Sequence, residues 1–345
     1  MGVIRMWLTI AVLVDHWGLQ AGVYTADMKK LGLNGGYSLM FFNVISGFLI
    51  TYTLTRNYGH DAAGIRHYYA NRAVRIFALY WPVLAIGCVA LPVVAWDLAA
   101  KDWPDLATSI FLLGSDWRLA FASYPHDHWA ALPKAFGPAW TLGAELVFYL
   151  SAPFIIRRPA VVVSIMAGSL AIRFWFVWRY GAQIQETWTL HFFGSTVCFF
   201  MFGILAHRAA TMFPLLTNHF VGLALLAAAV CILSLRKVYT FDSLAFWCAV
   251  PCFTLALPGV FALTKDIRWM NFVADVTYPM YILHIAVLVK LHEFFRPSLF
   301  VFFATVLVIA TTVHLLIERP LHVAFRARSR KLEIRRSEQP GGASA

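Results

Sequence analysis

Residues 298–317 read SLFVFFATVLVIATTVHLLI and contain no Asp, Glu, Lys or Arg. A helix of about 20 consecutive apolar residues is long enough to cross the hydrocarbon core of a bilayer. Similar runs recur at 4–22, 37–55, 76–96, 138–156, 160–180, 188–206, 219–235, 241–264 and 276–295. Because a helix satisfies its own backbone hydrogen bonds in lipid, this pattern predicts an all-α, polytopic transmembrane helical bundle of about ten membrane helices.

The composition supports a membrane protein. The chain of 345 residues is 60% hydrophobic and only 13% charged, whereas a soluble domain is about 25% charged. A soluble chain of this length could not cover its surface with so few charges. We expect residues 1–325 to form one transmembrane domain, and the polar, basic residues 326–345 to form a disordered cytoplasmic tail.

The net charge of +11 comes largely from Lys and Arg residues between the apolar runs. Basic clusters follow the second, fourth, sixth, eighth and tenth runs, which lie on one side if the helices alternate. The positive-inside rule makes that side cytoplasmic, so both termini are expected there. No basic cluster is interleaved with aromatic residues as a nucleic-acid site requires, and no CxxC pair suggests a metal site.

Arg5 and His16 are the first candidates for chemistry, eleven residues apart on one predicted helix. At about 100° per residue they share a face, about 16 Å apart along the axis. Ionisable groups inside a membrane usually face a cavity or a partner, and histidine accepts protons near neutral pH. A packing histidine bonded to a neighbouring helix is an equally open reading. Asp15 points about 100° away, so it is not automatically the partner of His16.

Arg72 and Arg75 have the i, i+3 spacing that puts both guanidinium groups on one helix face, at the cytoplasmic start of the third run. Such a pair suits a phosphate or a pyrophosphate. Topology or anchoring to lipid headgroups is the alternative.

Glu145 is the acidic residue of the fourth run, and Thr141 shares its face at i, i+4. A carboxylate among apolar residues needs a partner, a proton or water. A salt bridge to Arg173 or Arg179 is the structural alternative to a functional role.

Two weaker features complete the candidates. Ser46 and Gly47 place small groups in the second run, where close helix contact is an ordinary explanation. His284 is an intramembrane histidine in the ninth run, but no pair of histidines is placed clearly for haem ligation.

Six motifs in order resemble those of acyltransferase family 3, integral membrane enzymes that O-acylate bacterial surface glycans and other molecules. The motifs are Arg5 and His16 with ten residues between them, 41–50 (FFNVISGFLI), 68–81 with Arg72 and Arg75, 140–149 (WTLGAELVFY), 278–284 (YPMYILH) and 317–320 (IERP). The resemblance covers nearly the whole chain.

This resemblance implies a multi-pass protein of the bacterial inner membrane that takes an acyl-CoA donor, commonly acetyl-CoA, from the cytoplasm. It also implies that His16 is catalytic and that Arg72 and Arg75 contribute to donor binding or activity. Thr141 stands where Ser is common in the family, and Asn43 interrupts the second motif. These departures leave the acyl chain length and the acceptor open.

The leading hypothesis is a membrane O-acyltransferase, a transferase that needs no metal or bound cofactor. His16 would be the general base on the acceptor hydroxyl, and Glu145 would orient the histidine or that hydroxyl. Arg72, Arg75 and Arg5 would hold the donor. Substrate contacts are expected from Ser46, Trp140, Thr141, Tyr281 and His284.

The expected partners are membrane lipid, acyl-CoA and a carbohydrate or other hydroxyl acceptor, with no nucleic acid. The alternative is a transporter or flippase for a glycan or lipid, which could use the same intramembrane His, Glu and Arg residues. Inverted repeats would favour this alternative, and none is evident in the sequence.

Overall fold

The computed structural model describes residues 1–21, 34–59, 61–99, 103–117, 134–180, 187–234 and 242–325. Every regular element within these ranges is helical, which confirms the all-α prediction. Eight of the described helices are long and apolar enough to cross a membrane. They are α1 (Gly2–Ala21), α3 (Gly35–Asn57), α4 (Ala62–Ala90), α9 (Pro159–Tyr180), α10 (Phe193–Met212), α12 (Leu244–Thr264), α13 (Arg268–His292) and α14 (Leu299–Val313). The last of these continues through the π-helical turn η5 (His314–Glu318) to Phe325, so that the whole span has 27 residues.

The other two expected runs also form helices, but shorter ones. They are α8 (Trp140–Ile155) and α11 (His219–Ser234), each of 16 residues, which is less than the roughly 20 residues of a full span. The remaining elements are the short helices α5 (Pro92–Ala99) and α6 (Trp103–Phe111), the 3₁₀ helices η1 (Lys134–Ala139) and η4 (Pro214–Thr217), and the π-helical turn η3 (Thr187–His191).

The third membrane helix begins earlier than its apolar run. The run was expected at 76–96, but α4 occupies Ala62–Ala90 and is capped by Asp61, whose side chain accepts from the Gly64 N–H. Arg72 and Arg75 therefore lie inside this helix, not at its start. The reason is that a capped helix continues through polar residues as long as its backbone bonds are made, whereas hydropathy marks only the apolar part.

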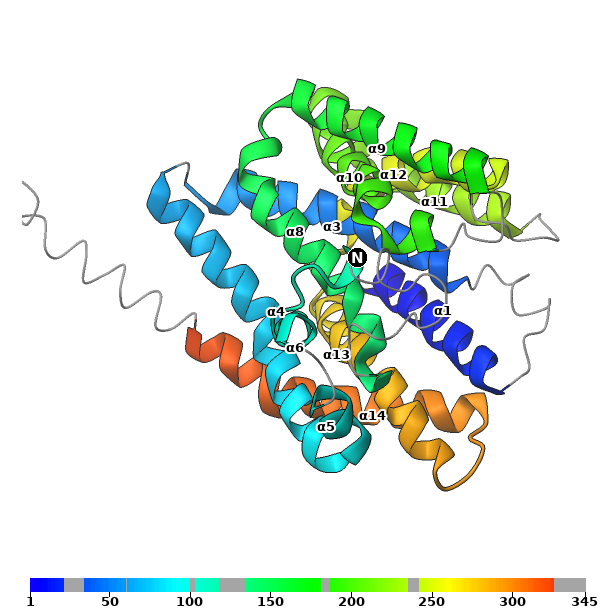
Figure 1. Cartoon of the computed structure of the whole chain (residues 1–345). Coiled ribbons are helices and arrows are strands. Elements are labelled where there is room, and N and C mark those ends of the chain that lie inside the picture. The colour runs from blue at the N-terminus through cyan, green and yellow to red at the C-terminus, as the bar shows by residue number, and fades with distance from the viewer. Residues whose placement is uncertain are drawn as a thin grey trace, which may run out of the picture.

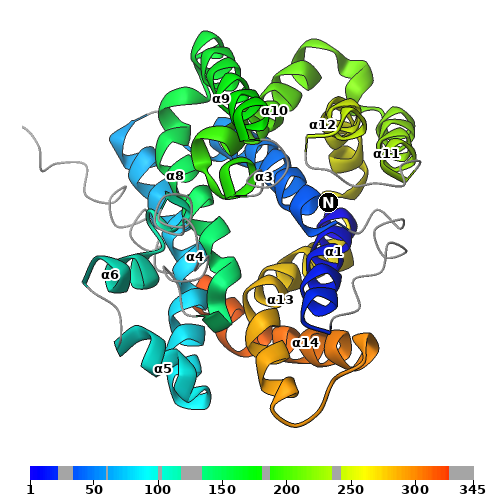
Figure 2. The same cartoon turned by 45° about the vertical axis from the view of Figure 1, so that its right-hand side comes forward.

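Two groups of helices lie on either side of α3 (Figures 1 and 2). One group contains α9, α10, α11 and α12, and the other contains α1, α13 and α14. Between them, α3 contacts α1, α8, α10 and α12. Because α3 touches helices of both groups, its side chains are placed to reach any space enclosed between them.

Close packing of α3 against α10 depends on two glycines. A Cβ atom on Gly47 would lie 2.1 Å from the Phe200 carbonyl oxygen, and one on Gly203 would lie 2.1 Å from the Val44 carbonyl oxygen. Only glycine allows two membrane helices to approach this closely. The structure thus confirms close helix contact in the second run, and it turns Gly47 toward α10.

Several helix ends that carry basic residues meet at one end of the bundle. The Met1 amino group donates to Thr264 at the end of α12, and Gly2 packs against Met270 of α13. At the end of α10, Arg208 donates to the carbonyl oxygen of Ile156, just beyond α8. These contacts agree with the alternation of helices expected from the sequence. That this end is cytoplasmic remains a prediction, and the expected tail, 326–345, lies outside the described residues.

Candidate active site

A cavity of about 580 Å³ lies among α1, α3, α4, α8 and α13. Arg72 and Arg75 both line it, as their i, i+3 spacing on α4 predicts. The ionisable side chains around it other than tyrosines are Arg5, His67, Arg72, Arg75, Glu145 and His322. Cations outnumber the single carboxylate, so the cavity suits an anionic ligand.

Two carboxylates hold Arg75. Its Nη1 lies 3.4 Å from Oδ1 of Asp275 on α13 and 3.6 Å from Oε1 of Glu318 in η5. The Glu318 side chain is 1% exposed, and its other oxygen lies 2.8 Å from Nδ1 of His314. Removing a carboxylate from water is costly unless it is paired. Arg75 therefore compensates the buried charge of Glu318 as well as facing the cavity.

Arg72 has different surroundings. It forms no ion pair within the described part of the chain, and its guanidinium carbon lies 5.8 Å from the ring centres of Tyr68 and Tyr149. Its Nε is buried without a hydrogen-bond partner among the described residues. Because a guanidinium group has five N–H donors, Arg72 keeps donors for an anion. Arg5 also faces the cavity with no ion pair to a described residue.

Glu145 lies on α8 and is held by two hydroxyl groups. Ser46 of α3 donates to its Oε1 at 2.6 Å, and Tyr149 donates to its Oε2 at 2.9 Å. The alternative of a salt bridge to Arg173 is wrong, because Arg173 is buried and pairs with Asp242. The described residues provide Glu145 with no salt bridge to Arg179 either. Its carboxylate therefore stays at the cavity wall.

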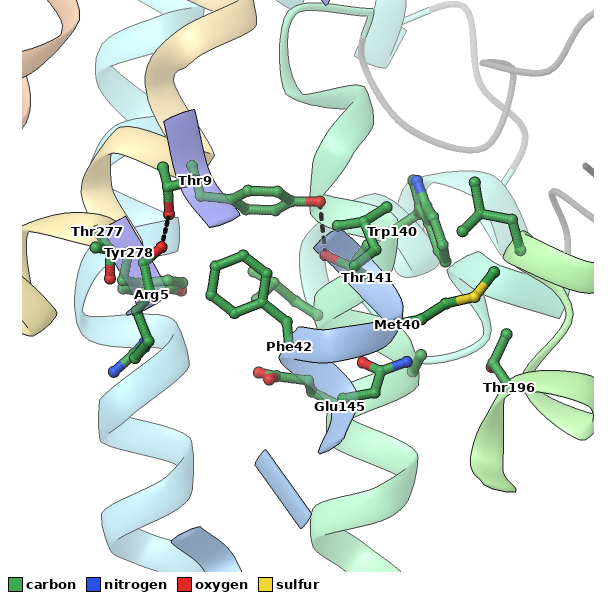
Figure 3. Close-up of a pocket in the computed structure, with 16 residues that line it drawn as sticks. Arg5, Thr9, Met40, Phe42, Trp140, Thr141, Glu145, Thr196, Thr277 and Tyr278 are labelled. Carbon is green, nitrogen blue, oxygen red and sulfur yellow. Dashed lines mark hydrogen bonds between the residues drawn. The ribbon is translucent and has the colours of Figure 1, made fainter. Parts of the chain in front are cut away.

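A second, smaller pocket of about 80 Å³ lies next to the cavity. Four of the lining side chains are common to both spaces: Arg5, Phe42, Glu145 and Tyr278. Figure 3 shows Phe42 in the middle of the pocket, with Arg5 on one side and Trp140 and Thr141 on the other. Helices α1, α3, α8 and α13 thus bring the first, second, fourth and ninth apolar runs to one place.

Thr141 and Tyr281 line this pocket and bond to each other. The Thr141 hydroxyl oxygen lies 3.0 Å from that of Tyr281, and both lie 3.1 Å from the carbonyl oxygen of Pro138, so two hydroxyl protons are shared among three close contacts. Pro138 lies where η1 gives way to α8, and its carbonyl is available because the 3₁₀ turn ends there. The two hydroxyls therefore tie α13 to the start of α8.

His16 forms a hydrogen bond with His284. Its Nδ1 lies 2.9 Å from Nε2 of His284, and the ring centres are 4.9 Å apart. His284 is fully buried, and its Nδ1 lies 2.6 Å from the carbonyl oxygen of Tyr281. Neither histidine lines the cavity or the pocket, although Arg5 lines both. Although Arg5 and His16 were expected to share a face of α1, the two spaces reach Arg5 and do not extend to His16.

The expectation that Glu145 could orient His16 is not met. The imidazole of His16 meets His284 because α13 packs against α1, whereas α8 packs against α3 and α4. The other role expected for Glu145, contact with an acceptor hydroxyl, stays a prediction.

The expected residues thus form two groups. Arg5, Ser46, Arg72, Arg75, Glu145, Trp140, Thr141 and Tyr281 line the two spaces, and His16 and His284 form a separate pair.

Sequence reasoning gave no role to Tyr149, Asp275 or Glu318. Tyr149 follows Glu145 by four residues and could have been found from helical spacing. Nothing local pointed from Arg75 to Asp275, which is 200 residues away.

A family model described as an acyltransferase domain, that of acyltransferase family 3, matches residues 1–319. No curated protein and no solved structure matches the chain. The matched stretch includes every residue that lines the smaller pocket, and all those of the larger cavity except His322 and Phe325. The chain therefore belongs to acyltransferase family 3 and is a membrane acyltransferase.

Proposed function

We propose that the chain is an O-acyltransferase that moves an acyl group, in the simplest case acetyl, from acyl-CoA to a hydroxyl of a carbohydrate or related acceptor. The observation that carries this proposal is the pair of neighbouring spaces that share Glu145, one large and cationic and one small. A two-substrate transfer needs such an arrangement, because a bulky anionic carrier must deliver a small group to a separate acceptor.

The larger cavity suits the carrier. Coenzyme A presents a diphosphate and a 3′-phosphate, and guanidinium groups bind phosphate oxygens with paired, charge-assisted hydrogen bonds. Arg72 and Arg5 line the cavity without ion pairs to described residues. We place the cavity on the cytoplasmic side, with both termini, because the basic helix ends gather there and acyl-CoA is a cytoplasmic metabolite. In this proposal the membrane is the bacterial inner membrane.

The smaller pocket suits the acyl group. Its volume of about 80 Å³ is about a seventh of the 580 Å³ of the larger cavity. A space this small favours a short acyl group over a long chain. In this proposal one of the Thr141 and Tyr281 hydroxyls at its wall exchanges its present bond for one to the thioester carbonyl oxygen, which is the substrate role expected for them.

The reaction needs a base for the acceptor hydroxyl, and His16 has that role in the proposal. The acceptor oxygen attacks the thioester carbonyl carbon as its proton moves to His16. The new C–O bond forms, the C–S bond breaks, and the sulfur of coenzyme A leaves and takes up the proton. Tyr281 connects the two parts of the site, because its hydroxyl lines the pocket and its carbonyl oxygen bonds to His284.

The test combines cells and purified protein. Mass spectrometry of surface glycans from cells with and without the gene should identify an ester that depends on it. In liposomes, His16→Ala should lower turnover by about 10²–10⁴-fold while acyl-CoA binding is kept. The matched control is His219→Ala, which changes an exposed histidine at the start of α11. Movement of a glycan or lipid across the membrane without acyl-CoA consumption would refute the proposal and favour a transporter or flippase.

A further inference from the structure

The hydrogen bonds around His284 determine which of its nitrogens carries a proton. Its Nδ1 lies 2.6 Å from the carbonyl oxygen of Tyr281, and a carbonyl oxygen can only accept. Nδ1 of His284 therefore carries the hydrogen. A neutral imidazole has a single N–H, so Nε2 of His284 presents a lone pair. The full burial of the ring favours this neutral form, since a buried charge without a counter-ion is costly.

The same reasoning extends to His16. Its Nδ1 lies 2.9 Å from the His284 Nε2 lone pair, so Nδ1 of His16 is the donor in that bond. The tautomer of a histidine is set by the bond that one nitrogen makes. Nε2 of His16 is then left with a lone pair, which is the form that a general base requires.

We infer that His284 is a positioning residue that fixes the tautomer and ring orientation of His16, so that Nε2 of His16 is the atom that takes the acceptor proton. This inference rests on the proposed role of His16 as the base. When the proton moves from the acceptor oxygen to Nε2, His16 becomes an imidazolium, and its Nδ1–H continues to donate to His284. His284 thereby stabilises the cation by accepting its hydrogen bond, and it stays neutral itself. In serine hydrolases an ionised carboxylate accepts the corresponding hydrogen bond from the catalytic histidine.

Of the two histidines on α13, His284 is the one that contacts another histidine. His292 lies on the same helix, and its Nδ1 bonds to the Leu288 carbonyl oxygen at 2.9 Å, much as that of His284 bonds to Tyr281. In the described structure His292 has no histidine partner, whereas His284 does. His292 is therefore a matched control for the loss of an imidazole from α13.

The first test is kinetic. His284→Leu puts an apolar side chain in place of the imidazole and removes the histidine acceptor, so kcat should fall by roughly 10–100-fold, the order of magnitude for losing a supporting hydrogen bond of this kind. The KM for acyl-CoA should stay constant, because His284 does not line the donor cavity. His284→Gln should recover most of the loss, since its amide oxygen can accept from His16. His292→Leu should leave kcat within about twofold.

A double-mutant cycle separates positioning from a structural role. In the His16→Ala background, His284→Leu should cause no further loss of turnover, because a positioning residue acts only through the residue that it positions. Additive losses would overturn the inference. If His16→Ala itself keeps near-normal turnover, the proposed base is wrong. If His16→Ala loses turnover and His284→Leu does not, only the present inference fails.

A spectroscopic test does not depend on whether the His284 variants fold. Solid-state NMR of ¹⁵N-histidine-labelled wild-type protein in lipid distinguishes protonated from unprotonated ring nitrogens. The signals of His16 are assigned from their absence in His16→Ala. We expect Nδ1 of His16 to carry the hydrogen and Nε2 to be unprotonated. The opposite tautomer in the resting protein would overturn the inference.

Discussion

Arg72→Ala and Arg75→Ala should have different effects, although the two residues share a helix face and a cavity. Arg75→Ala leaves Glu318, which is 1% exposed, with the His314 imidazole as its remaining partner, at 2.8 Å. Breaking a buried ion pair costs about 3–5 kcal/mol. Arg75 is itself 26% exposed and lies 3.6 Å from Glu318, so we expect a smaller loss, about 1–3 kcal/mol. Asp275, at 45% exposed, adds little.

Arg72→Ala removes a side chain that has no ion pair to a described residue, so stability should change by no more than about 0.5 kcal/mol. Donor binding should weaken instead. A hydrogen bond to a charged group contributes about 1.5–3 kcal/mol, which corresponds to a rise in the KM for acyl-CoA of roughly 10- to 150-fold. Arg72→Lys should recover only part of this loss, because lysine cannot bind two phosphate oxygens through a planar fork.

The assay measures thermal unfolding in detergent and the KM for acyl-CoA for both variants. A third variant, Arg75→Ala with Glu318→Gln, removes both charges and should regain most of the stability lost by Arg75→Ala alone. Arg268→Ala is the control for charge, since Arg268 is exposed and lines neither space. Equal changes in stability and KM for Arg72→Ala and Arg75→Ala would refute the distinction between the two arginines.

Three further predictions concern other parts of the chain. Glu145→Gln should keep folded protein but lose turnover, because it removes the charge at the wall shared by the two spaces; loss of folded protein instead would indicate a structural role. Cysteines introduced at Ala62 and Leu113, both exposed, should be labelled from opposite sides of the membrane, and labelling of both from outside would contradict the topology. Burial raises the pKa of Asp116, between α6 and η1, to about 7. The folded protein then binds the proton more tightly than the unfolded chain. The free energy of unfolding should therefore fall as the pH rises from about 4 to about 7, by at most about 4 kcal/mol. Asp116→Asn should flatten the dependence of the melting temperature on pH, and an unchanged dependence would count against this origin.

The sequence was sufficient to predict the helices because hydropathy is a local property. An uninterrupted apolar run, such as 298–317, must form a helix in lipid whatever its neighbours are, since no other partner is present for its backbone groups. Helix ends were less certain. Asp61 extends α4 well before its apolar run, because capping and helix propensity, and not hydropathy, decide where a helix begins.

The sequence also identified the residue types of the site, because Arg, Glu and His are costly inside a membrane and their presence needs a reason. Helical spacing correctly placed Arg72 and Arg75 on one face. Spacing within one helix could not show that Arg75 meets Glu318, that Ser46 meets Glu145, or that His16 meets His284, 268 residues away. Those contacts depend on which helices pack together and how each is rotated about its axis. These choices depend on the packing of all the helices at once, and so only the tertiary structure decided them.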